Sequence, residues 1–247
     1  MGKSTLWLSL VAVIVSFAGG FMLANAINRT ELTSLRSEND RLKSNPPETK
    51  ADDGELTISN EQINAAIAEA DANPGNFDIQ KKHGIGLYQY GAFKKNPEII
   101  AEASRLLQRA NQLNPKDRDV VLGLAHSYFD TGFYKKENAG FEKAREYYGK
   151  ALALKPDDVE TQTEIAMTYF LLDPPDYAHA VPEFEKSLKI DPKHEKTLQF
   201  LGQSYARTNR IEDAEKMLAK LREINSGNAS ITELTSVIEQ ARNGRTK

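Results

Sequence analysis

The stretch that decides the fold reads Val121-Leu122-Gly123-Leu124-Ala125-His126-Ser127-Tyr128-Phe129. Its apolar residues predict a helix, and the following Asp130-Thr131-Gly132 predicts a stop. A second predicted helix carries Ala144, Tyr148 and Ala151 and ends at Leu154-Lys155-Pro156. Residues 121–156 therefore predict a helix-turn-helix unit.

This unit occurs four times in the chain. Ten residues after each of four prolines stands a small residue, then a large one, then a turn residue. The prolines are Pro74, Pro115, Pro156 and Pro192; the small residues are Gly84, Ala125, Ala166 and Gly202; the large ones are Leu87, Tyr128, Tyr169 and Tyr205; the turn residues are Gly91, Gly132, Asp173 and Asn209. The recurrence indicates a repeat protein.

The pattern resembles the tetratricopeptide repeat, in which the second helix carries a small residue at both ends of an eight-residue span. The second-helix triplets are Ala103/Leu107/Ala110, Ala144/Tyr148/Ala151, Ala180/Phe184/Ser187 and Ala214/Leu218/Leu221. The proline spacings of 41, 41 and 36 exceed the 34 residues of the family. We expect the extra residues to lie between the turn and the second helix, at Lys94–Ile100, Lys135–Phe141 and around Asp173–Asp176.

The resemblance implies an all-α fold, a right-handed helical solenoid of about four helix pairs with flanking cap helices. We expect a short tail at residues 1–4, a transmembrane helix at 5–27, a coiled-coil stalk at 28–44 and a linker at 45–57. A capping helix at 58–74 precedes the repeats at 75–115, 116–156, 157–192 and 193–226, and another follows at 227–243. Ser59 and Gln62 predict a capping box for the first cap.

Within each repeat the small residues allow the two helices to approach closely. Large side chains then fill the spaces between pairs, and we expect five of them in the core: Tyr128, Tyr148, Tyr169, Phe184 and Tyr205. In the last cap helix, apolar residues at helical spacing predict the buried face: Ile231, Leu234, Ile238 and Ala241.

Residues Thr5–Ile27 contain no charged residue and are long enough to cross a bilayer. A retained membrane anchor and a signal peptide cleaved after Ala26 are both compatible with this segment, and its length favours the anchor. Lys3 favours a periplasmic solenoid on an inner-membrane anchor, whereas Arg29, Arg36 and other cations after the segment favour the opposite orientation.

The segment after the anchor has the spacing of a two-heptad coiled coil, with Leu32, Leu35, Asn39 and Leu42 on its seam. An asparagine in such a seam favours a parallel dimer. A solvated helical stalk is the alternative.

The family resemblance implies that the first helices of the pairs line a groove for a protein partner. The side chains turned away from the second helix are Lys81, Ile85, Tyr88, Leu122, His126, Phe129, Thr163, Met167, Phe170, Gln199, Gln203 and Ala206. The first three copies are mainly apolar and aromatic, so the groove suits an apolar peptide or an amphipathic helix. Part of the same assembly, or a terminus of the chain itself, is the alternative occupant.

Composition narrows the function further. The net charge of -3 gives no indication of nucleic-acid binding, and the absence of cysteine excludes disulfides and thiolate sites. The histidines His83, His126, His179 and His194 lack the spacing of a metal site, and no nucleophile–base pair or phosphate loop is present. We therefore expect no enzyme activity, cofactor, metal or small-molecule substrate. The sequence favours a membrane-anchored adaptor, with a structural subunit of a membrane complex as the alternative.

Overall fold

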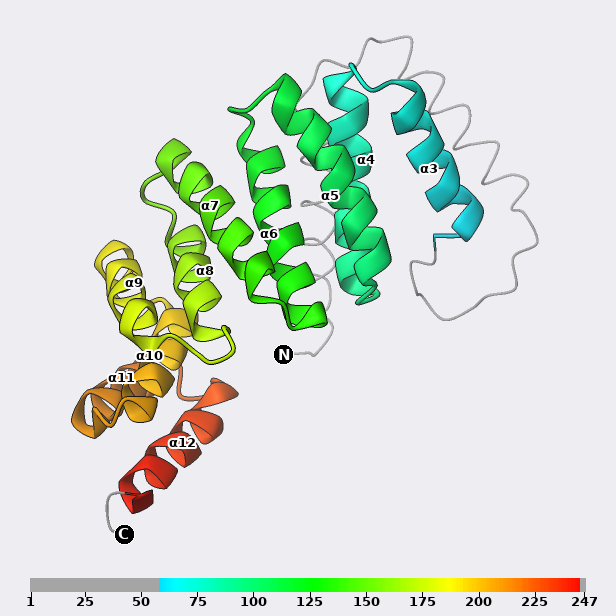
Figure 1. Ribbon diagram of the computed structural model, residues 1–247. Helices are drawn as coiled ribbons and strands as arrows, with labels where there is room; N and C mark the ends of the chain where they lie inside the picture. The colour runs from blue at the N-terminus through cyan, green and yellow to red at the C-terminus, as the bar shows by residue number, and fades with distance from the viewer. Residues whose placement is uncertain (1–57, 245–247) are drawn as a thin grey trace, which may run out of the picture. The chain divides into compact units, whose positions relative to one another are not determined.

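The computed structural model describes residues 58–244, in which ten helices and no strand are present (Figure 1). The predicted membrane helix at 5–27, the stalk with Leu32, Leu35, Asn39 and Leu42, and the linker at 45–57 lie outside the described residues. None of the described helices has the length and hydropathy needed to cross a membrane.

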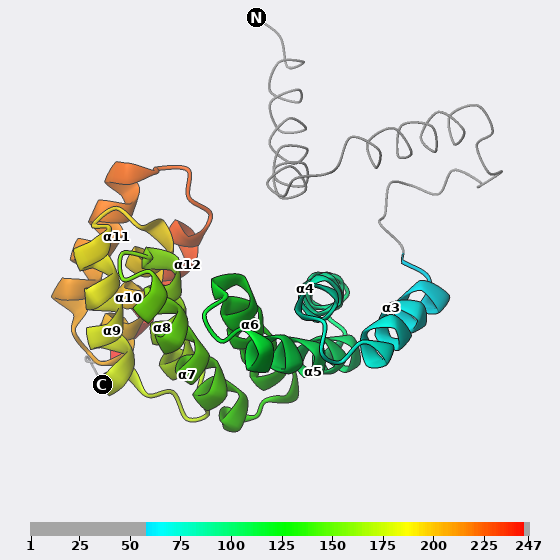
Figure 2. The ribbon, with the colours of Figure 1, turned by 90° about the horizontal axis from the view of Figure 1, so that it is seen from above.

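The described helices form successive antiparallel pairs between two end helices. We call the first helix of each pair the A helix and the second the B helix. The bounds are α3 Asn60–Ala72, α4 Phe77–Phe93, α5 Pro97–Leu113, α6 Arg118–Lys135, α7 Asn138–Leu154, α8 Val159–Phe170, α9 Tyr177–Ile190, α10 Glu195–Arg207, α11 Ile211–Ile224 and α12 Ser230–Gly244. In Figure 2 the A helices α4, α6, α8 and α10 lie on the inner side of the row and the B helices α5, α7 and α9 on its outer side.

The extra residues of the first two repeats extend the helices instead of forming loops. Helices α4 to α7 have 17 or 18 residues, whereas α8 to α11 have 12 to 14. The predicted stop at Asp130-Thr131-Gly132 is wrong, because α6 continues to Lys135. Gly132 is instead a helical residue at which α7 approaches closely, since a Cβ on Gly140 would lie 2.5 Å from the Gly132 Cα.

The small residues of the repeat occupy close helix contacts, as predicted. A Cβ on Gly84 would lie 2.8 Å from the Leu107 side chain in the partner helix. Gly202 is packed against Leu234 and Met217 at 3.0 and 3.3 Å from such a Cβ. Ala125 and Ala166 are fully buried.

Three of the five aromatic residues expected in the core are buried, and two are not. Tyr148, Phe184 and Tyr205 are buried. Tyr128 and Tyr169 are half-exposed, because each ring lies over the surface of a B helix. The Tyr128 ring stacks on Tyr147.

Both ends of the repeat array are covered by a helix. At the start, Ser59 and Gln62 form the predicted capping box of α3. At the end, α12 buries Leu234, Val237 and Ile238 against α10 and α11. The apolar face that an end repeat would expose is therefore covered.

A chain of polar contacts links the start of each A helix to the start of the next helix on the same side. Lys81 donates to Asp117, the N-cap of α6, at 2.9 and 2.8 Å. Arg118 pairs with Asp158, the N-cap of α8. The same relation recurs between Glu160 and His194, at 2.9 Å, and between Asn228 and Glu195, at 2.6 Å. Each helix start is thus held by the preceding repeat.

Candidate functional site

The A-helix face consists of the side chains that α4, α6, α8 and α10 turn away from their B helices. The structure distributes the predicted groove residues between this surface and the contacts beneath it. Lys81, Ile85, Tyr88, Leu122, His126, Phe129, Phe170 and Gln199 are half-buried, whereas Thr163, Met167, Gln203 and Ala206 are buried.

Four predicted groove residues in the second half are therefore not accessible to a partner. Thr163 is fully buried because α10 packs over it, and its hydroxyl lies 2.7 Å from that of Thr197. Met167, Gln203 and Ala206 are 6%, 7% and 2% exposed. The prediction that these four side chains contact a partner is therefore wrong.

The predicted apolar residues mainly fill the seams between repeats. Phe129 packs edge-on against Phe141 of the same repeat, with ring centroids 5.4 Å apart, and belongs to a cluster that includes Ile165 of the next repeat. Phe170 packs in the same way against Phe200 at 5.2 Å. Such contacts stabilise the stacking of the repeats. The A-helix face is thus less apolar than the sequence suggested.

At one end of the face, Lys81 belongs to the junction between α4 and α6. Burial disfavours the charged ammonium, but hydrogen bonds to Asp117 and Asp119 outweigh this effect and leave the pKa of Lys81 above its usual value. We infer that Lys81 positions the two helices.

The first two repeats hold a polar aromatic cluster, which we define as Tyr88, His126, Asp130 and Tyr148. The Tyr88 ring stacks on His126, with centroids 6.0 Å apart and planes at 13°. The Tyr88 hydroxyl donates to Asp130 at 3.1 Å, and the Tyr148 hydroxyl lies 2.8 Å from Nδ1 of His126. Residues from α4, α6 and α7 therefore meet at one point.

Burial determines the protonation of this cluster. It raises the pKa of Tyr88, with the charge of Asp130 as the second cause, and it raises the pKa of Asp130. Burial also lowers the pKa of His126 and raises that of Tyr148. The Tyr148 hydroxyl is thus protonated and forms a hydrogen bond with a neutral imidazole near neutral pH.

Sequence reasoning missed Asp130 as a site residue because it was assigned to a turn. Within the described chain the Asp130 carboxylate accepts from the neutral Tyr88 hydroxyl and forms no ion pair. Its nearby carboxylate, Glu164, is by contrast paired with Lys196 of α10. The repeat spacing gave no signal for Asp130, since the counterpart of Tyr88 in the next repeat is Phe129 and the counterpart of Asp130 in the preceding repeat is Gln89.

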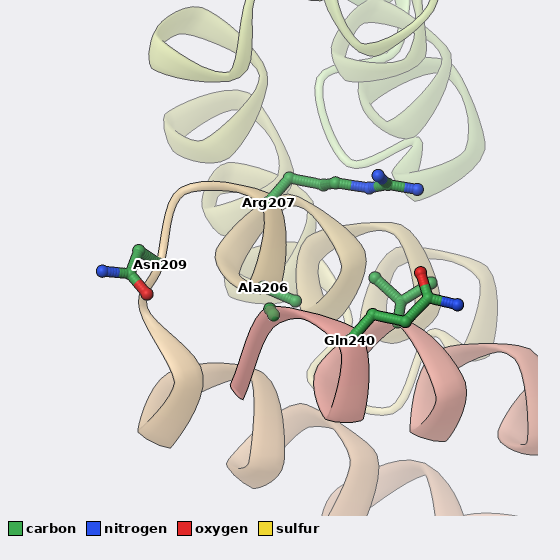
Figure 3. Close-up of a pocket in the computed structure, with 6 residues that line it drawn as sticks. Ala206, Arg207, Asn209 and Gln240 are labelled. Carbon is green, nitrogen blue, oxygen red and sulfur yellow. The ribbon is translucent and has the colours of Figure 1, made fainter. Parts of the chain in front are cut away.

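The described residues contain no group of three or more histidine or acidic side chains arranged to hold a metal ion. A small hollow is present elsewhere, where α10, the following turn and α12 meet (Figure 3). Figure 3 shows Arg207 and Gln240 extending along one side of it, whereas Asn209 points away. None of the predicted groove residues except Ala206 lines it.

Comparison with known proteins agrees with this architecture. Residues 171–237 match the family model described as tetratricopeptide repeat. The solenoid is a tetratricopeptide-repeat fold. No curated protein matched the sequence.

Several solved structures share the fold. A crystal structure of MamA protein has a TM-score of 0.54 at 19% identity, with 67% of this chain and 81% of that chain covered. TTC0263, a thermophilic tetratricopeptide repeat protein of Thermus thermophilus, has a TM-score of 0.51 at 14% identity, with 72% and 91% covered. At such identities the likeness defines the fold alone. Tetratricopeptide repeat domains generally mediate protein–protein interaction, and scaffolds of this type are typically not enzymes.

Proposed function

We propose that this chain is a membrane-anchored scaffold or adaptor that binds a peptide or helix of a partner protein on its A-helix face. In this role it assists the assembly of an envelope or membrane complex. It has no catalytic activity of its own.

The observation that carries the proposal is the polar aromatic cluster of the first two repeats. Within the described chain Asp130 is desolvated without a cation paired to it, a state that a hydrogen-bond donor of a bound partner would relieve. Tyr88 offers a ring held in place by stacking on His126, and tyrosines of this kind dominate the binding energy of many interfaces.

Site-specific photo-cross-linking tests this proposal in the full chain. A photoreactive phenylalanine analogue replaces Tyr88 in one variant and Tyr147, a half-buried tyrosine of the B helix α7, in the control. We expect one discrete cross-linked partner from position 88 and none from position 147, and Asp130→Ala should abolish the product. Equal products from both positions, or a product insensitive to Asp130→Ala, would count against partner binding on the A-helix face.

The alternative function is that of a structural subunit of a larger membrane complex, without a free binding face. The half-buried positions of Leu122 and Phe129 favour it, since these side chains already fill seams between repeats. A fixed stoichiometry in the purified complex supports the subunit, whereas a face that binds added peptides with micromolar affinity supports the adaptor.

The remaining parts of the proposal concern residues outside the described range. Residues 5–27 anchor the chain as a single span in the inner membrane, with the solenoid on the periplasmic side, and Leu32, Leu35, Asn39 and Leu42 form a parallel dimer. Protease treatment of intact spheroplasts tests the orientation, because a periplasmic solenoid is digested. Disulfide cross-linking of Asn39→Cys tests the dimer, and a chain that stays monomeric in membranes contradicts it.

A further inference from the structure

The two longer repeats share a sequence at the turn between their helices. It reads Gly91-Ala92-Phe93-Lys94-Lys95 at the end of α4 and Gly132-Phe133-Tyr134-Lys135-Lys136 at the end of α6. In both copies an aromatic residue is followed by two lysines. Figure 1 shows the turn between α4 and α5 and the turn between α6 and α7 on the same side of the row of helices.

The aromatic side chains at these two turns are exposed. Phe93 is 62% and Phe133 is 53% exposed, the two highest values among the large apolar side chains of the described chain. The Lys94 ammonium lies 5.3 Å from the centroid of the Phe93 ring, and the Phe133 ring packs edge-on against Tyr134 at 5.6 Å. Both turns thus carry an exposed phenylalanine close in sequence to two lysines. We call Phe93, Lys94, Lys95, Phe133, Lys135 and Lys136 the aromatic-basic edge.

The backbone gives an independent indication that the positive charges matter at this edge. Lys95 and Lys136 have φ values of 51° and 55°, in the left-handed region that favours glycine or asparagine. The corresponding left-handed residue after α10 is indeed an asparagine, Asn209, with φ 63°. Lysine therefore stands twice at a position whose backbone disfavours it.

Lysines outnumber acidic residues at these two turns, and the other turns of this type lack the pattern. These two turns contain four lysines and only two acidic residues, Glu98 and Glu137. The turns after α8 and α10 contain neither an exposed phenylalanine nor a lysine pair. The edge is therefore confined to the two longer repeats.

We propose that the aromatic-basic edge rests on a lipid bilayer with anionic headgroups. Phe93 and Phe133 insert into the membrane–water interface, and the lysines bind the phosphate groups of the lipid headgroups. Lysine in place of arginine favours a lipid over a protein, because protein interfaces are depleted in lysine and enriched in arginine. This surface is separate from the A-helix face and adds a second interaction to the proposed function.

Nitroxide labelling of the full chain tests the proposal, because the protein lacks cysteine and a single introduced cysteine labels one position. Ala139→Cys reports on the edge, where α7 begins, and leaves the phenylalanines and lysines intact. Ala153→Cys is the matched control, since both residues are exposed and lie in the same helix, roughly 21 Å apart along its axis.

The labelled chain is reconstituted into vesicles of phosphatidylcholine with or without phosphatidylglycerol. We expect collision of the label at 139 with a water-soluble nickel complex to fall at least about two-fold in anionic vesicles only, with no change at 153. Equal accessibility at 139 and 153 overturns the proposal. So does protection at 139 without anionic lipid, which instead indicates a protein contact at this edge.

Two sets of variants separate charge from general effects of substitution. The quadruple variant Lys94→Gln, Lys95→Gln, Lys135→Gln, Lys136→Gln should lose the protection at 139. The control set replaces four exposed lysines elsewhere, Lys116, Lys155, Lys189 and Lys193, by glutamine and should retain it. Loss in both sets, or in neither, overturns the proposal. Cross-linking from Tyr88 reports on the A-helix face separately, so the two proposals fail independently.

Discussion

Gly140 of α7 lies so close to Gly132 of α6 that a Cβ on Gly140 would stand 2.5 Å from the Gly132 Cα and 2.6 Å from its nitrogen. The atoms on the other side belong to the backbone and cannot rotate away. Gly140→Ala should therefore force the helices apart and lower the free energy of unfolding by about 1–3 kcal/mol, as overpacking does. Urea denaturation followed by circular dichroism measures the change.

Gly149 provides the control in the same helix. A Cβ there meets nothing within 4 Å, and the residue is exposed. Gly149→Ala should stabilise the protein by about 0.5–1 kcal/mol because alanine is the better helix former. If Gly140→Ala and Gly149→Ala shift the urea midpoint in the same direction, the close contact between α6 and α7 does not determine the effect of substitution at Gly140.

Truncation of Leu234 should weaken the end of the repeat array. The side chain is fully buried and contacts the position of Gly202 in α10. Leu234→Ala should cost about 2–4 kcal/mol and increase hydrogen exchange in α12 and α10 before the other helices. Thr232→Ala, an exposed neighbour, is the control, and uniform exchange throughout the chain would contradict the role of α12 as a cap.

Asp71 should contribute to stability in a pH-dependent manner. Hydrogen bonds from Arg105 and Arg109 lower the pKa of Asp71 from 3.8 to about 2. Since the pKa is lower in the folded chain, the contribution is present above 3.8 and is lost as the pH falls through about 2. Asp71→Asn should thus lower the urea midpoint at neutral pH, and its difference from the wild type should shrink below about pH 4. Asp157→Asn, an exposed carboxylate, is the control.

His126 should make the protein less stable in mild acid. Burial lowers its pKa below 6.5, with Glu164 and Asp158 opposing and Lys196 reinforcing the shift. The unfolded chain therefore binds the proton first, and the free energy of unfolding decreases as the pH falls below 6.5. His126→Gln should have a shallower decrease between about pH 7 and pH 5, as read from urea midpoints. His179→Gln, whose side chain is 66% exposed, is the control, and identical slopes for all three proteins would refute this assignment.

The repeat register followed from the sequence because it depends on local features. Prolines end helices, and a small residue at a fixed position of each repeat indicates a close helix contact. Gly84 of α4, for example, packs against Leu107 of α5. The helix lengths did not follow in the same way. Glycine is typical of a turn, but Gly132 lies inside α6, where the backbone of Gly140 in α7 leaves little room for a side chain.

The candidate site was less predictable than the fold. Helical spacing identified Tyr88 and His126 on the A-helix face, and the structure stacks their rings. It did not distinguish them from Thr163 or Gln203, because burial of those residues depends on how the neighbouring repeat packs. Asp130 was missed since an aspartate near a glycine is typical of a turn.

The chain of N-cap contacts also has a consequence for how the protein forms. Asp117, Asp158, His194 and Asn228 each bind a residue only 33 to 40 positions earlier in the chain. Every such contact can close once the next helix has left the ribosome, without waiting for the C-terminus. Contacts of this short range favour rapid folding, and assembly can proceed repeat by repeat during synthesis. The order of translation is then also the order in which the binding face is completed.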